Sequence, residues 1–222
     1  MKTLLAAALL VPTMAIAARQ PDLLERIAIR QQQLDRYAVE MQIRVFGAPD
    51  SAADIAFQAR AARSGPAMLQ EFQHYIVLLH PEMRLVIDRN GRTIHLNAAH
   101  LETPVPPAAD PAALLDRARG AGYSIDVDER PDDIALRFTS ERQPTFLLTF
   151  GTADLRLRRM EMQGPASVNN PQGRTVVTYT WHELNESHAA RMTPAYYVQR
   201  AADGWRPTAA FDGFRVVTSR EK

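Results

Sequence analysis

Strict alternation of apolar and polar residues between Tyr37 and Val45 is the clearest pattern along the chain. A period of two residues is typical of a β-strand, in which successive side chains point to opposite sides. We therefore expect one side of this strand to face a core or a cavity and the other side to face water. The apolar side consists of Tyr37, Val39, Met41, Ile43 and Val45.

Further β-rich segments follow, most of them separated by short turns. Asn90-Gly91 lies between two such segments and indicates a hairpin turn. Residues 53–65 fit a strand or a helix, because apolar residues alternate there while alanine is frequent, and we favour the strand. The remaining predicted strands are residues 71–79, 83–88, the hairpin 86–96, 123–128, 133–138, 145–150, 155–162, 174–181, 196–201 and 214–219.

Two segments show helical signals. Residues 21–37 begin with Pro21-Asp22, a typical helix start, and their apolar residues recur near helical spacing. Residues 110–123 carry Asp110 as a plausible N-cap and Gly120 at the C-terminal stop. The apolar residues of the first helix are Leu23, Leu24, Ile27 and Leu34.

The order of these elements predicts the fold class. Strands do not alternate regularly with helices, so a parallel sheet is not expected. The chain should adopt an α+β fold that is mainly β. We expect a strongly curved antiparallel sheet of about 10–12 strands, a half or open barrel, with the N-terminal helix and the mid-chain helix on its concave side.

The first 17 residues have the pattern of a secretory signal peptide. Lys2 precedes a short apolar run, and Ala15-Ile16-Ala17 fits a small-x-small cleavage site. The run is too short to span a bilayer core of roughly 30 Å. We therefore expect export to the periplasm, no integral membrane segment in the mature chain, and a single domain over residues 18–222.

Charge and cysteine content exclude several functional classes. Removal of the segment would take away Lys2, its only charged residue, and the formal net charge of +1 would fall to zero. A neutral chain has no electrostatic attraction for nucleic acid, so we expect no nucleic-acid partner. The chain also has no cysteine to carry a lipid anchor or to perform thiol chemistry.

The stretch "TWHELNESHAA" (residues 180–190) holds the strongest candidate for a metal site. His182 and His188 are six residues apart, whereas helical zinc motifs place two histidines four residues apart. The preceding residues alternate, which favours His182 as a solvated strand end, followed by a turn at 185–187. The sequence contains no nucleophile elbow, P-loop or dinucleotide motif. We therefore expect that the protein is not an enzyme and that it has no catalytic residue, no cofactor and no bound metal.

The order of the elements resembles the periplasmic lipoprotein-carrier fold of the LolA/LolB type. This order is the signal peptide, the leading helix, "YAVEMQIRVF", the hairpin "VIDRNGRTIHL", the mid-chain helix and the later strands. The end of the chain, "YYVQRAADGWRPTAAFDGFRVVTS", is similar to that of uncharacterised exported proteins with this fold. The resemblance implies an apolar cavity beneath covering helices, in which carriers of this family hold the acyl chains of lipoproteins.

A soluble binding or carrier protein for a lipid, an acyl chain or a lipoprotein is therefore the leading functional hypothesis. A monomer is expected. The alternatives are an interaction module of an envelope or secretion assembly, with an envelope protein as partner, and a metal-dependent hydrolase that uses His182 and His188. The candidate cavity lining comprises Tyr37, Val39, Met41, Ile43 and Val45, joined by Phe146, Leu148 and Phe150.

Overall fold

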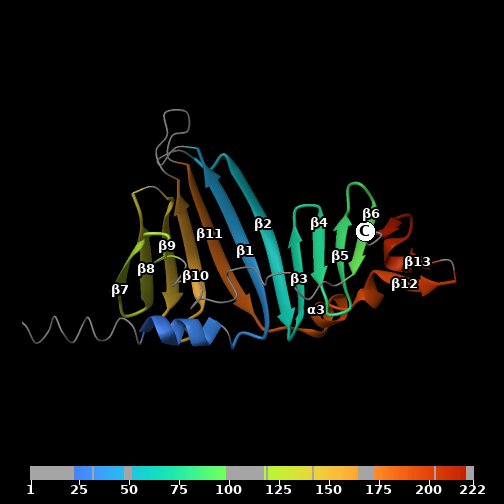
Figure 1. Cartoon of the computed structure of the whole chain (residues 1–222), viewed down its shortest axis with the longest axis horizontal. Helices are drawn as coiled ribbons and strands as arrows, with labels where there is room; N and C mark the ends of the chain where they lie inside the picture. Colours follow the sequence, from blue (N-terminus) through green and yellow to red (C-terminus); the bar gives the residue numbers. More distant parts are fainter. Residues whose placement is uncertain are drawn as a thin grey trace, which may run out of the picture. The chain divides into compact units, whose positions relative to one another are not determined.

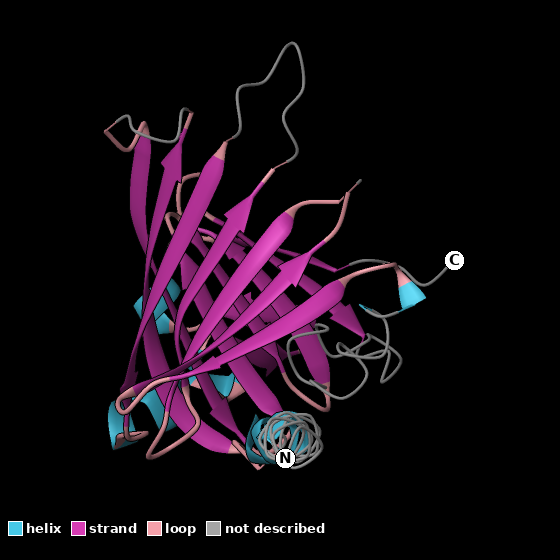
Figure 2. Cartoon of the chain, turned by 90° about the vertical axis from the view of Figure 1, so that its left-hand side faces the viewer, coloured by secondary structure: helices cyan, strands magenta, loops and turns pink. Residues whose placement is uncertain are grey.

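The computed structural model describes residues 23–31, 33–47, 52–98, 118, 120–141, 143–164, 173–202 and 204–218, and most of them lie in strands (Figure 2). The predicted signal peptide and most of the predicted mid-chain helix (residues 110–123) fall outside these ranges, and the described residues Ala118 and Gly120 are helical. The chain divides into two compact units. Unit 1 comprises Met1–Leu34 and Val105–Arg158, and unit 2 comprises Asp35–Pro104 and Arg159–Lys222. The single domain over residues 18–222 stays a prediction.

The described residues of unit 1 include the N-terminal helix and a three-stranded antiparallel meander (Figure 1). The strands are β7 (Ser124–Glu129), β8 (Asp133–Thr139) and β9 (Thr145–Gly151). β8 lies between the other two, with Leu136 opposite both Val127 and Leu148. The helix spans residues 23–31, as predicted within the longer segment 21–37.

The apolar side of the N-terminal helix packs on this meander. Leu23, Leu24 and Ile27 are buried in one cluster with side chains from β8 and β9. The end of the helix is fixed to the segment after β9, since Arg30 donates a hydrogen bond to the carbonyl of Asp154 and Gln31 donates one to that of Leu155. The buried members of this core are Leu23, Leu24, Ile27, Ile134, Leu136, Phe138, Phe150 and Leu155.

Among the described residues, unit 2 contributes nine strands to the larger sheet, in the order β14-β6-β5-β4-β3-β2-β1-β11-β10. Neighbouring strands are antiparallel where their register is given, except that β14 runs parallel to β6. The strands are β1 (Arg36–Phe46), β2 (Ile55–Ser64), β3 (Ala67–Phe72), β4 (Tyr75–Leu79), β5 (Met83–Asp88), β6 (Thr93–Ala98), β10 (Leu157–Gln163), β11 (Arg174–His182) and β14 (Arg215–Thr218).

The C-terminal segment connects β11 to β14 through several short elements. They are α3 (Glu186–Arg191), η2 (Pro194–Tyr196), β12 (Val198–Ala201), β13 (Gly204–Pro207) and η3 (Ala209–Phe211). β12 and β13 form a separate two-stranded antiparallel sheet.

The mainly β fold is confirmed, and the strand order does not return on itself, which agrees with the predicted half or open barrel. Residues 53–65 contain the strand β2, as favoured. Three expectations are wrong. A turn at Gln73-His74 divides the strand expected at residues 71–79 between β3 and β4. The sheet is mixed because β14 pairs in parallel with β6, and α3 replaces the turn expected at residues 185–187. Asn185 caps that helix, because its side-chain oxygen accepts a hydrogen bond from the backbone N–H of His188.

Candidate functional site

The strands of unit 2 present two unlike faces, which we name after one residue of each. The Leu78 face carries Ala38 of β1, Ala62 of β2 and Leu69 of β3, which lie opposite one another in register, together with Leu78 of β4. The Met41 face carries the side chains of the other parity, because successive residues of a strand point to opposite sides.

The Leu78 face is filled by the C-terminal segment. Met192, Tyr197 and Val198 are buried in one cluster with Leu78 and Leu85. Trp205, Phe211, Phe214 and Leu184 pack against the same cluster. This face is therefore the hydrophobic core of unit 2.

The Met41 face contains the predicted strand residues, so register brings them together as expected. On β1, Met41 lies opposite Ala59 of β2 and Tyr179 of β11, and Ile43 lies between Phe57 and Val177. The apolar residues of this face are Tyr37, Val39, Met41, Ile43 and Val45 of β1, Ile55, Phe57, Ala59 and Ala61 of β2, Met68 and Phe72 of β3, Tyr75, Val77 and Leu79 of β4, Val86 of β5, Val177, Tyr179 and Trp181 of β11, and Met160 and Met162 of β10.

Many side chains of the Met41 face keep contact with solvent. Met41, Ile43 and Val45 are half-buried, whereas Ile55 is 54% exposed and Phe72 is 39% exposed. Exposed large apolar groups on one continuous face are unusual for a filled core and mark a surface that can bind an apolar partner.

Polar groups gather at one end of the Met41 face. Arg63 of β2 lies opposite Tyr37 of β1 and Met68 of β3. The Tyr37 ring contacts the Trp181 ring edge-on, with 5.1 Å between the ring centroids. Burial raises the pKa of the Tyr37 hydroxyl, and the positive charge of Arg63 lowers it by a smaller amount. Gln70 of β3 shares this end of the face.

The predicted residues of β9 lie in unit 1. Phe150 is buried in the core that contains the N-terminal helix, and Phe146 and Leu148 pack against that core. Their placement beside the β1 residues in one cavity stays a prediction.

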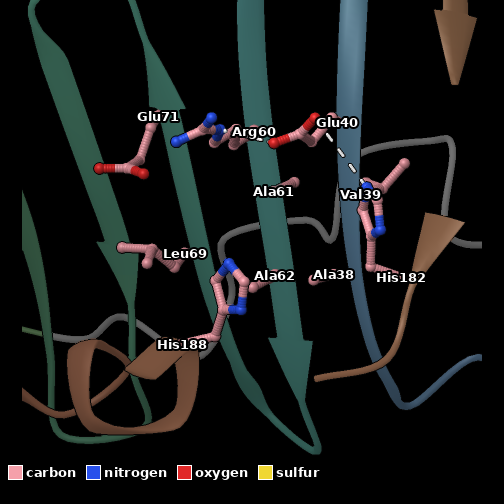
Figure 3. Close-up of a pocket in the computed structure, with 10 residues that line it drawn as sticks. All are labelled: Ala38, Val39, Glu40, Arg60, Ala61, Ala62, Leu69, Glu71, His182 and His188. Atoms are coloured by element: carbon pink, nitrogen blue, oxygen red, sulfur yellow. Dashed lines mark ion pairs between the residues drawn. The ribbon is translucent and has the colours of Figure 1, made fainter. Parts of the chain in front are cut away.

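A small pocket lies on the Leu78 face, beside α3 (Figure 3). Its volume is about 30 Å³, which is room for about two water molecules. His182 of β11 and His188 of α3 both line it, so the fold does bring the two histidines of "TWHELNESHAA" to one place. The full lining is Ala38, Val39, Glu40, Arg60, Ala61, Ala62, Leu69, Glu71, His182 and His188.

The carboxylates in this pocket are paired with cations. Glu40 lies 3.0 Å from the Arg60 guanidinium and 3.9 Å from Nε2 of His182. Glu71 accepts hydrogen bonds from Arg191 of α3 and from Arg89, the latter at 3.0 Å. The residues that the structure describes contain no group of three His, Cys, Asp or Glu arranged to hold a metal ion. These contacts attach α3 to the sheet.

Sequence reasoning missed the polar end of the Met41 face. Arg63 belongs to a segment whose strand assignment was itself uncertain, so its parity relative to Tyr37 could not be read. The pairing of β1 with β2, which places the two residues opposite each other, is the signal that was needed.

The sequence matches no family model and no curated protein. Among solved structures, a LolA superfamily protein from Nitrosomonas europaea is similar, with 13% identity, a TM-score of 0.36, and coverage of 78% of this chain and 98% of that chain. An uncharacterized conserved protein from Thermus thermophilus is similar with 10% identity and a TM-score of 0.46, and the match covers 88% of this chain and 98% of that chain. A putative outer membrane lipoprotein-sorting protein domain from Vibrio parahaemolyticus is similar with 7% identity and a TM-score of 0.29, and the match covers 74% of this chain and 93% of that chain.

Two of these three names match the lipoprotein-carrier fold that the sequence resembles. All three TM-scores lie below 0.5 and all identities below 25%, so neither the fold nor the function of this chain follows from these similarities.

Proposed function

We propose that the protein is an exported carrier that holds a lipid, an acyl chain or a lipoprotein on its Met41 face, without catalysing a reaction. One observation carries this proposal. The two faces of the same strands are both rich in apolar residues, yet the C-terminal segment packs on the Leu78 face, while Met41, Ile43 and Phe72 on the other face keep access to solvent.

The chemistry of the Met41 face suits an acyl chain. Each methylene group that leaves water contributes about 0.8 kcal/mol, so a chain laid across the face would gain free energy along its whole length. The face includes Met41, Met68, Met160 and Met162, whose flexible thioether side chains adapt to irregular apolar partners.

Export is the second part of the proposal. The signal-peptide pattern of residues 1–17 supports a periplasmic location, where a neutral mature chain with an apolar binding face could move lipids or lipoproteins between membranes. None of the helices among the described residues has the length and apolar character needed to cross a bilayer.

Titration of the mature protein with a hydrophobic fluorescent probe tests the binding site. We expect stoichiometric binding by the wild type and loss of binding by Met41→Asp, because a carboxylate on the apolar face must be desolvated under the ligand. Gln42→Asp is the matched control, since Gln42 is the next residue of β1 and points to the opposite face. Circular dichroism should show that both variants fold, and Met41→Gln provides a milder change at the same position.

Equal probe binding by Met41→Asp and Gln42→Asp would show that the Met41 face is not the binding site. Native mass spectrometry of the wild type with no uptake of any apolar ligand would contradict the carrier function itself. A stoichiometric protein that occupies the face in envelope extract would instead favour the interaction module.

A further inference from the structure

The geometry of the Met41 face points to a ligand with an anionic head group, bound at Arg63, and an apolar tail that runs along β1 towards Val45. This inference rests on the proposed carrier function and adds the class of ligand. A fatty acid or a lipid with an anionic head group has both parts.

Arg63 occupies a particular position on this face. Its neighbours on the adjoining strands are Tyr37 of β1 and Met68 of β3. The apolar residues of β1 on this face continue from Tyr37 to Val45. The Arg63 side chain is half-buried, and its Nε donates a hydrogen bond to the carbonyl of Gly65. The guanidinium thus lies at the margin of the apolar face and is held there by its own turn.

The charge of Arg63 is not balanced by a carboxylate in the part of the chain that the structure describes. Four other arginines of unit 2 form ion pairs with glutamates there: Arg60 with Glu40, Arg89 and Arg191 with Glu71, and Arg159 with Glu161. None of the described ion pairs includes Arg63. A half-buried guanidinium beside apolar groups gains from an anionic partner, because its charge is less well solvated there.

The groups next to Arg63 suit an anionic head. Guanidinium binds carboxylate and phosphate through paired N–H donors, and these charge-assisted hydrogen bonds are stronger than neutral ones. The Tyr37 hydroxyl, whose pKa is raised chiefly by burial, keeps its proton at neutral pH and supplies a further donor close to Arg63.

The length of the face fits the tail. The strand from Tyr37 to Val45 advances by roughly 26 Å at the rise of an antiparallel strand. One leaflet of a bilayer has a hydrocarbon thickness of about 15 Å, so an acyl chain of a membrane lipid can lie along β1 with its head at Arg63. No carboxylate side chain of β1 points to this face, because Glu40 lies on the opposite parity with Arg60.

Calorimetric titration with matched amphiphiles tests this inference. We expect palmitate to bind more tightly than methyl palmitate, which has the same tail without the charge. Arg63→Gln should weaken palmitate binding by roughly ten-fold or more, the equivalent of one charge-assisted interaction, and should change methyl palmitate binding less than about two-fold. Arg44→Gln is the control, because Arg44 is an exposed arginine of β1 on the opposite face.

A second anionic amphiphile separates the sources of the head group. If lysophosphatidylglycerol binds the wild type and binds Arg63→Gln more weakly, the site is assigned to phospholipid head groups. If Arg63→Gln weakens the binding of palmitate alone, the site is assigned to free fatty acids. Equal binding of palmitate and its ester to the wild type overturns the inference and leaves the carrier function intact. Failure of all three amphiphiles to bind overturns both proposals.

Discussion

Leu78 and Leu79 are neighbours in β4, yet their side chains point to opposite faces of the unit 2 strands. Leu78 lies opposite Leu69 and Leu85 and is 0% exposed beneath the C-terminal segment. Leu79 lies opposite Met68 on the Met41 face and is only half-buried. This one dipeptide therefore separates the hydrophobic core from the proposed binding surface.

Alanine substitutions at the two leucines should differ in cost. Leu78→Ala leaves a cavity in a filled core and should lower the free energy of unfolding by about 2–5 kcal/mol. Leu79→Ala removes methyl groups that already meet solvent, so its cost should be about 1 kcal/mol or less. Urea unfolding measures both values. Equal costs would show that the Met41 face is filled as completely as the Leu78 face.

The N-terminal helix offers the same comparison in unit 1. Ile27 is buried against β8 and β9, whereas Ile29, two residues later, is 45% exposed. Ile27→Ala should cost about 2–5 kcal/mol, and Ile29→Ala should stay within about 0.5 kcal/mol because alanine is also the better helix former. Chemical unfolding followed by circular dichroism distinguishes them. A large loss for Ile29→Ala would mean that the exposed side of the helix has a partner.

Alternation predicted strand positions well because it is a local property of the chain. The apolar parity of Tyr37 to Val45 needs only the pleat of a single strand, and register confirms that these residues share a face. The Asn90-Gly91 hairpin is confirmed for the same reason: β5 and β6 pair around it, and the Asp88 carboxylate accepts hydrogen bonds from both turn amides.

The choice between core and binding surface could not be predicted, because it depends on contacts between distant segments. In β4, "YIVLL" is apolar at both parities, so no local pattern says which side the C-terminal segment covers. The same limit applies at β1, whose even side was expected to face water. Ala38 on that side is buried, because it packs in one cluster with Met192 and Val198 of the C-terminal segment.

Glu71 links α3 to the sheet, and its removal should destabilise unit 2. It accepts hydrogen bonds from Arg191 and Arg89, and the side chains of Glu71 and Arg191 are only 16% and 21% exposed. Glu71→Gln leaves two guanidinium groups without their anion, so we expect a loss of about 2–3 kcal/mol in urea unfolding.

Glu40→Gln is the matched control for this change. Its pair with Arg60 is more than half exposed on both sides, and such a pair contributes about 0–1 kcal/mol. If Glu40→Gln costs as much as Glu71→Gln, attachment of α3 is not what makes Glu71 important.

Tyr197 should make the protein sensitive to alkaline pH. Its side chain is fully buried in the core of unit 2, and burial raises the pKa of its hydroxyl from 10.0 to about 12. The folded state therefore holds this proton more tightly than the unfolded state. Its contribution to stability is complete below about pH 10 and is lost as the pH rises towards 12, at about 1.4 kcal/mol per pH unit in that window.

Tyr197→Phe should flatten the decline of stability between pH 10 and 12, because phenylalanine has no proton to lose. Burial also raises the pKa of Tyr179 to about 12, so part of the slope should remain and should fall further in the double variant with Tyr179→Phe. Urea unfolding at half-unit pH steps, starting at pH 8, gives the slopes. An unchanged slope in Tyr197→Phe would show that its hydroxyl ionises as readily in the fold as in the unfolded chain, and that the C-terminal cover admits water.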